Sequence, residues 1–123
     1  MGQYHFVANL TKKQFLHAHK LGNGLKLMEF ISAQDGVPQA LILLLACSNG
    51  RGGGDFRGED PECLVGSWAG DAIAIVGDYY EEEDIPNHVL PPKWRDTFED
   101  ISVKVRELME KSGEFQMQES WEL

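Results

Sequence analysis

Short alternations of apolar and polar residues open the chain and predict two strands. In residues 3–10 (QYHFVANL) every second side chain falls on the same face: Tyr4, Phe6 and Ala8 on one, His5 and Val7 on the other. Residues 11–20 (TKKQFLHAHK) continue this period, with Phe15, His17 and His19 sharing a face. Residues 21–30 then follow a turn at Asn23 and Gly24, and their pattern fits either a third strand or a short helix.

A Leu- and Ala-rich run in residues 36–50 (GVPQALILLLACSNG) predicts a helix. Pro38 suits its first turn, where the missing N–H would be unpaired anyway. The run is apolar on all sides, so we expect a helix buried across a sheet. Gly50 is the expected stop.

Residues 64–77 (LVGSWAGDAIAIVG) predict a hairpin. Two strand-like runs, 64–69 and 72–77, flank Gly70 and Asp71, and a glycine at the first central position is what a type II′ turn requires. In the second run we expect Ile73 and Ile75 on one face, opposite the small and β-branched residues between them.

The last periodic segment predicts a second helix. Its apolar residues step by four, three, four and three: Trp94, Phe98, Ile101, Val105 and Leu108. Lys111 and Gly113 suit its end. Two starts remain open, a capping box at Asp96 and Glu99, or a strand end followed by Ser102 as N-cap. Residues 114–123 form an expected tail.

This order of elements predicts an α+β fold. We expect a single domain over residues 1–123, with a small, mainly antiparallel sheet packed against two helices. The length suffices for one hydrophobic core, and 42% hydrophobic with 25% charged residues is an ordinary globular composition.

The net charge of the chain is strongly negative, which limits the kinds of molecule that it can bind. Acidic residues outnumber basic ones 20 to 11, for a net charge of −9. Such a surface is repelled by phosphate backbones and anionic lipids, which argues against general nucleic-acid binding and against a membrane partner. A basic surface on another protein is the complementary partner.

Other features predict a cytoplasmic protein. No signal-like segment opens the chain, and the longest apolar run, residues 40–47, is far shorter than the roughly 20 residues of a membrane span. Two cysteines, Cys47 and Cys63, are too few for a disulfide framework.

The glycine-rich stretch SNGRGGGDFRGEDP (residues 48–61) is a candidate anion cradle, with Arg51 and Arg57 as charged arms. However, it follows the predicted helix rather than preceding one, and it matches neither GxxxxGK[ST] nor GxGxxG. We therefore interpret it as a surface connection and expect no cofactor.

Three histidines offer a second candidate site. His17 and His19 would share a strand face, and His5 would lie on a neighbouring strand, an arrangement suited to ligand binding or proton transfer. No third ligand with recognisable metal spacing follows, so structural histidines and no metal are expected. Which residues, if any, are catalytic is not indicated.

The acidic run after the predicted hairpin is the third candidate, and it carries two adjacent tyrosines. Tyrosine is enriched at protein interfaces, and neighbours on an extended chain point to opposite sides, so core packing does not explain both rings. The segment consists of Asp78, Tyr79, Tyr80, Glu81, Glu82, Glu83 and Asp84.

Several strings resemble a family of small bacterial and phage-associated proteins of no known activity. They are MGQYHFVANLTKKQFLHAHKLGNGLKLMEF, SNGRGGGDF, GSWAGDAIAIVGDY and FEDIS, and the likeness runs from Met1 to about Val105. The resemblance implies one compact cytoplasmic domain and brings no site residues.

Two functional hypotheses follow. The preferred one is a non-enzymatic inhibitor, adaptor or regulator that binds another protein through residues 78–84. The alternative is a small ligand- or metal-binding domain, or an enzyme, that uses His17 and His19 with residues 50–54 as a lid. A homodimer formed by pairing edge strands is a third, structural hypothesis.

Overall fold

A four-stranded sheet organises the chain, and the computed structural model describes residues 2–33, 35–47, 56 and 59–111. The strand order is β3-β1-β2-β4, where β1 pairs antiparallel with β2 and β3 while β2 pairs parallel with β4. The strands are β1 (His5–Asn9), β2 (Gln14–Leu16), β3 (Ile73–Gly77) and β4 (Glu99–Asp100). The helices are α1 (Leu27–Ile31), α2 (Val37–Leu45) and α3 (Ser102–Lys111), with 3₁₀ turns η1 (Ala18–Leu21) and η2 (Trp94–Asp96). The predicted α+β fold with a mainly antiparallel sheet is confirmed.

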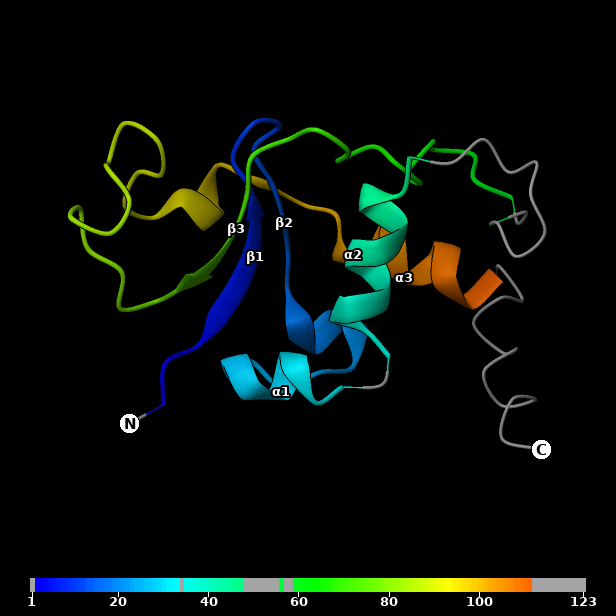
Figure 1. Cartoon of the computed structure of the whole chain (residues 1–123), viewed down its shortest axis with the longest axis horizontal. Helices are drawn as coiled ribbons and strands as arrows, with labels where there is room; N and C mark the ends of the chain where they lie inside the picture. The colour runs from blue at the N-terminus through cyan, green and yellow to red at the C-terminus, as the bar shows by residue number, and fades with distance from the viewer. Residues whose placement is uncertain (1, 34, 48–55, 57–58, 112–123) are drawn as a thin grey trace.

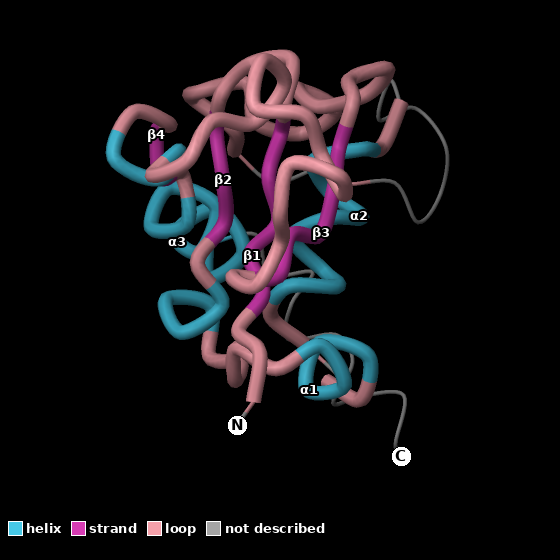
Figure 2. The backbone as a smooth tube through the Cα atoms, turned by 90° about the vertical axis from the view of Figure 1, so that its left-hand side faces the viewer, coloured by secondary structure: helices cyan, strands magenta, loops and turns pink. Residues whose placement is uncertain are grey.

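The sheet separates two hydrophobic cores. Helices α2 and α3 lie against one face, while the segment that follows β3 and the turn η2 cover the other (Figure 1). Val7 belongs to the core under the helices, and its neighbours Phe6 and Ala8 belong to the opposite core. The alternation predicted for β1 is therefore confirmed, and Figure 2 shows the sheet from the side that the segment after β3 covers.

The second strand is shorter than its pattern predicts. It ends at Leu16, because the Ser102 hydroxyl accepts the His17 backbone N–H at 2.6 Å and η1 begins at Ala18. His19 therefore lies in η1 and not on a strand. The ambiguous residues 21–30 contain the start of a short helix, α1, rather than a third strand.

Helix α2 is confirmed, but the expectation that it is buried all round is wrong. Val37, Ala40 and Leu44, at helical spacing, face the core. The side chain of Ile42 on the opposite side is 68% exposed. The helix forms an outer layer on a narrow sheet, so only one of its faces finds a partner. It ends at Leu45, and the predicted stop at Gly50 lies outside the described residues.

The predicted hairpin is wrong in its first half. Residues 65–69 form consecutive turns, and two of their N–H groups bond to the C-terminal end of α2: Gly66 to the Leu43 carbonyl and Trp68 to the Leu44 carbonyl, both at 2.9 Å. These bonds satisfy carbonyls that a helix leaves unpaired. Gly66 has φ +77°, and a Cβ there would lie 2.6 Å from the Ala46 carbonyl oxygen. The second half is β3, which pairs with β1 instead.

The predicted C-terminal helix begins later than the apolar spacing suggests. The N–H groups of Glu99 and Ile101 bond to carbonyls of Lys13 and Phe15, at 2.9 and 3.1 Å, so this segment is a strand. Helix α3 follows from Ser102, as one of the two predicted starts has it. The Trp94-to-Leu108 stripe is consequently divided between the two cores. Gly113 and the predicted tail fall outside the part of the chain described.

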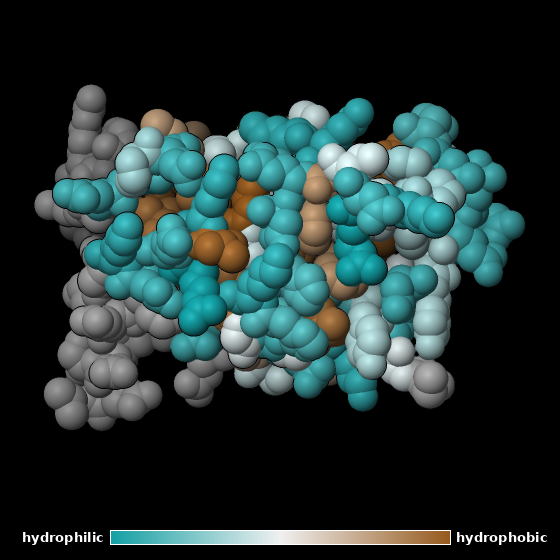
Figure 3. Space-filling model, turned by 180° about the vertical axis from the view of Figure 1, so that it is seen from behind, coloured by the Kyte–Doolittle hydropathy of each residue, from teal (hydrophilic) through white to brown (hydrophobic). Residues whose placement is uncertain are grey.

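The face of the molecule seen from behind is mainly hydrophilic (Figure 3). On this face, hydrophobic side chains form small areas among polar ones. Among the described helices, none has the length and apolar character needed to cross a bilayer. Cys47 and Cys63 are exposed free thiols.

Candidate functional site

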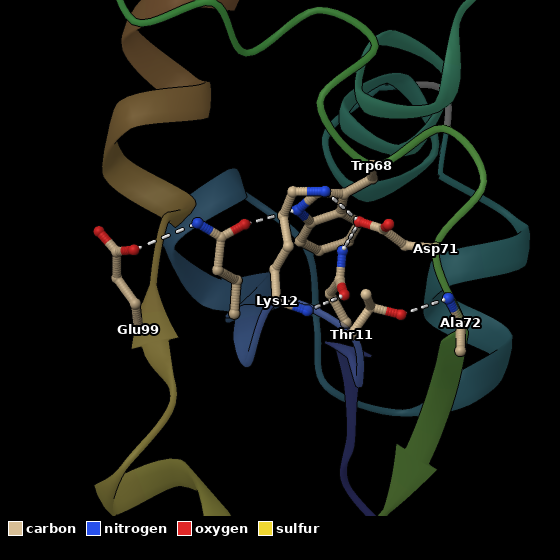
Figure 4. A network of polar contacts seen from close by, with 8 residues as sticks. Thr11, Lys12, Trp68, Asp71, Ala72 and Glu99 are labelled. Atoms are coloured by element: carbon tan, nitrogen blue, oxygen red, sulfur yellow. Dashed lines mark hydrogen bonds and ion pairs between the residues drawn. The ribbon is translucent and has the colours of Figure 1, made fainter.

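A polar network at one end of the sheet is the most connected set of charged and amide side chains (Figure 4). Asp71 accepts hydrogen bonds from the Asn9 amide at 2.9 Å and from Lys12 Nζ at 2.5 Å. Gln14 accepts from the indole N–H of Trp68 at 2.8 Å and donates to Glu99 at 3.2 Å. The network joins the β1–β2 turn to the segment before β3 and to β4.

This network is structural, because its members satisfy one another. The hydrogen bond from Asn9, followed by that from Lys12, lowers the pKa of Asp71. Hydrogen bonds from Gln14 and Lys104 likewise lower the pKa of Glu99. Carboxylates held in this way have little capacity left for a ligand.

The acidic face, which we define as residues 78–84, differs in this respect. The described salt bridges use Lys12, Lys20, Lys104 and Arg106, and none of them reaches the acidic face. Its five carboxylates are all exposed: Asp78, Glu81, Glu82, Glu83 and Asp84. The acidic face is therefore a concentration of negative charge that none of the described salt bridges neutralises.

Two aspartates hold the acidic face in shape. Asp78 Oδ1 accepts the Tyr4 backbone N–H at 3.0 Å. Asp84 Oδ2 accepts the Glu81 N–H at 2.9 Å, which closes a turn. The carboxylates of the three glutamates between these anchors have no hydrogen-bond partner among the described residues, and all three glutamates are exposed.

The two tyrosines have different roles, as their opposite directions along the chain predict. Tyr80 lies against the core that contains Trp94, and its hydroxyl is within 3.2 Å of the Leu90 carbonyl and 3.0 Å of the Pro91 carbonyl. Burial raises the pKa of this hydroxyl. Tyr79 is 55% exposed, although its hydroxyl donates to the Gly2 carbonyl at 3.4 Å. Tyr80 therefore anchors the segment, and Tyr79 is the aromatic group offered to a partner.

A groove of about 480 Å³ runs beside the acidic face. Its lining includes the carboxylates of Asp78, Glu81 and Glu82, the cationic side chains of Lys93 and Arg95, and the rings of Tyr80 and Trp94. The Arg95 guanidinium lies 4.1 Å from the centroid of the Phe6 ring and is thus already held by the protein's own aromatic core. The three carboxylates take part in none of the described salt bridges, so they can still pair with a cation.

Of the three histidines of the second candidate site, the structure brings together only His17 and His19. The rings of His17 and His19 lie 5.5 Å apart between centroids. His17 also meets the Phe6 ring edge-on at 5.1 Å, so it belongs to an aromatic cluster. Burial lowers the pKa of His17, against the opposing effect of the Asp100 carboxylate. This environment resembles core packing more than a ligand site.

His5 does not join this pair. Phe6, which touches His17, faces the core opposite that of Val7, and strand alternation places His5 on the face of Val7. In the described residues no three His, Cys, Asp or Glu side chains are placed to hold a metal ion. Arg51, Arg57 and the proposed lid of residues 50–54 lie outside the described part of the chain.

The sequence pattern does not point to the two cationic residues that line the groove, Lys93 and Arg95. Lys93 and Arg95 follow the pair Pro91 and Pro92, which reads only as an extended connection. Their position depends on this connection folding back so that the Leu90 and Pro91 carbonyls accept the Tyr80 hydroxyl. Nothing in the sequence indicates this contact beyond the prolines that follow the tyrosine.

Comparisons with known proteins add no relative. No family model matches the chain, and neither a curated protein nor a solved structure shows significant similarity to it. The resemblance of the quoted strings to small bacterial and phage-associated proteins stays a prediction.

Proposed function

We propose that this protein acts by binding another protein through the acidic face, whose complement is a basic surface. The observation that supports this most is the contrast between carboxylates. The carboxylates of Asp71, Glu99 and Asp100 are hydrogen-bonded within the fold, whereas those of Glu81, Glu82 and Glu83 have no described partner. Unpaired like charges crowded on one turn repel one another, and a basic partner relieves that repulsion.

The groove and Tyr79 suit such a partner. A lysine or arginine side chain that enters the groove meets three carboxylates, together with Lys93 and with Arg95, whose guanidinium lies over the Phe6 ring. Tyr80 and Trp94 also line the groove. Exposed Tyr79 adds an aromatic contact at the rim, and tyrosine is among the residues enriched at binding hot spots. The partner's charge would accelerate association as well as add affinity.

Photo-crosslinking tests the proposal in lysate of the cells that make the protein. A photoreactive amino acid replaces Tyr79 in one sample and Val103 in another, since Val103 is a comparably exposed residue on α3. We expect the Tyr79 sample alone to crosslink a defined partner with a basic surface. Glu82→Lys should abolish that crosslink, while Glu107→Lys, an equal charge change at an exposed site of α3, should leave it intact. The same partners from both positions, or no loss with Glu82→Lys, would contradict the proposal.

The alternative of a ligand site at His17 and His19 rests on the proximity of their rings. The buried Nδ1 of His17, which has no hydrogen-bond partner among the described residues, also favours it, and the Nδ1 of His5 is in the same condition. A thermal-shift screen with small anions and divalent metals tests it. A stabilisation that disappears in His17→Ala would support this alternative over protein binding.

A further inference from the structure

The outer edge of β3 is an unpaired strand edge in the described part of the chain. β3 lies at one end of the sheet and pairs only with β1 (Figure 2). The pairing register and two flanking hydrogen bonds identify which backbone groups face outward. The Leu10 N–H bonds to the Ala72 carbonyl, and the Asp78 N–H bonds to the Tyr4 carbonyl, both at 2.8 Å.

Hydrogen-bonded pairs alternate along an antiparallel ladder, so the backbone groups of Ala74 and Val76 point toward β1. Those of Ile73 and Ile75 consequently point away from the sheet. No hydrogen bond from the described residues reaches the N–H or carbonyl of Ile73 or Ile75. These groups form a ladder that an added strand would complete.

A second groove lies beside this edge and joins it to the acidic face. It measures about 440 Å³, and its lining includes Ile75, Tyr79, Asp84 and Ile85. Ile75 is 47% exposed. Since Asp78 follows directly after β3, a strand laid along this edge would run onto the carboxylates at one end.

We propose that the partner docks by β-strand addition: an extended basic segment pairs with Ile73 and Ile75 and extends its cationic side chains toward the acidic face. This inference rests on the function proposed above. Charge selects the occupant, because a second copy of the chain carries the same net charge of −9 and is repelled, whereas a basic segment is attracted. Backbone hydrogen bonds would supply affinity, and the carboxylates specificity.

Amide hydrogen exchange of the full chain, followed by NMR, tests this directly. The probe is the capped peptide Lys-Thr-Lys-Val-Lys-Thr-Lys, and its control replaces every lysine by glutamate. We expect fast exchange at Ile73 and Ile75 in the free protein, and slow exchange at Ala74 and Val76. With the lysine peptide at ten times its Kd, exchange at Ile73 and Ile75 should slow about tenfold, since about a tenth of the protein stays free.

Substitution of Ile75 separates the backbone contribution from the side-chain contribution. Ile75→Pro removes the outward N–H at an edge position that tolerates proline, and it should weaken peptide binding about tenfold or more. Ile75→Thr keeps the N–H and should weaken it less. If the proline variant does not fold, the exchange measurement on the unmodified chain still decides.

The outcomes distinguish this inference from the proposed function. Peptide-induced shifts confined to residues 78–84, without protection of Ile73 and Ile75, overturn strand addition and leave the acidic face as the binding site. Equal protection by both peptides supports strand addition and contradicts a basic partner. Protection that rises with protein concentration alone identifies a second copy as the occupant and overturns the inference, and so does an absence of binding.

Discussion

At the scale of single residues, polar groups that are hydrogen-bonded inside the protein stabilise the fold, whereas unpaired ones on the surface remain free for a partner. Trp68 has no exposed surface and donates its indole N–H to Gln14, which in turn bonds to Glu99. A buried hydrogen bond of this kind is costly to break on one side only, because the remaining partner stays dehydrated. Glu81, Glu82 and Glu83 lie at the opposite extreme, since they remain hydrated and contribute little to folding.

Trp68→Phe should therefore destabilise the protein by about 1–3 kcal/mol, because it leaves the Gln14 oxygen without its donor. Urea unfolding followed by circular dichroism measures the loss. Trp94→Phe is a matched control of equal size change, at an indole whose described contacts are with aromatic rings. An equal or larger loss at Trp94 would contradict a specific role for the indole hydrogen bond.

His17 should make stability depend on pH. Burial lowers the pKa of its ring in the folded state, so the unfolded chain binds the proton more readily. The free energy of unfolding should then fall as the pH drops through the ordinary histidine pKa of about 6.5. His17→Gln should show a smaller fall between pH 7.5 and 5.5. An NMR titration of the His17 ring with a midpoint at or above 6.5 would contradict this account.

At the scale of elements, backbone groups decide where helices and strands begin and end. Ser102 is fully buried at the start of α3, where its N–H bonds to Asp100 Oδ1 and its hydroxyl accepts the His17 N–H. One serine thus fixes the start of α3 and the end of β2 together.

Ser102→Ala should destabilise the protein by about 1–3 kcal/mol, because it leaves the His17 N–H unpaired. Ser32→Ala is the control, since that hydroxyl bonds to the Met28 carbonyl in an exposed position and its loss should cost less than about 0.5 kcal/mol. Thermal and urea unfolding compare the two variants. Equal effects would contradict a special contribution of the Ser102 hydroxyl to stability.

The sequence predicts elements best where periodicity and pairing agree. The alternation in β1 persists over the whole strand, and the Leu- and Ala-rich run forms α2; both elements are predicted correctly. Residues 64–69 alternate like a strand, yet the N–H groups of Gly66 and Trp68 bond to the end of α2 and the chain there forms turns. Two residues of β4 carry no periodic signal, and only their pairing with β2 defines them. Both segments were predicted wrongly because contacts with distant parts of the chain determine their structure.

The charge of the acidic face can be predicted from the sequence, but the grooves beside it cannot. The carboxylates of residues 78–84 are evident from the sequence, and opposite directions for Tyr79 and Tyr80 follow from chain geometry. The groove requires residues 90–95 to return to Tyr80, and the free edge of β3 requires the strand order. Neither long-range arrangement leaves a local pattern.

At the scale of the whole molecule, the net charge of −9 governs encounters with other molecules. Partner association should slow about tenfold or more as salt rises from roughly 0.05 to 0.5 M, because screening shortens the reach of the charges. Stopped-flow or surface-plasmon kinetics with the crosslinked partner would measure this. An association rate that ignores salt would show that apolar contacts drive binding.

The affinity of that partner for Glu82→Lys, compared with Glu107→Lys, tests the central claim most directly. Both variants change the net charge by the same amount, but only the first alters the acidic face. The account predicts that Glu82→Lys weakens binding about tenfold or more while Glu107→Lys changes it by less than about threefold. Equal weakening by the two variants would mean that overall charge, and not the acidic face, determines binding.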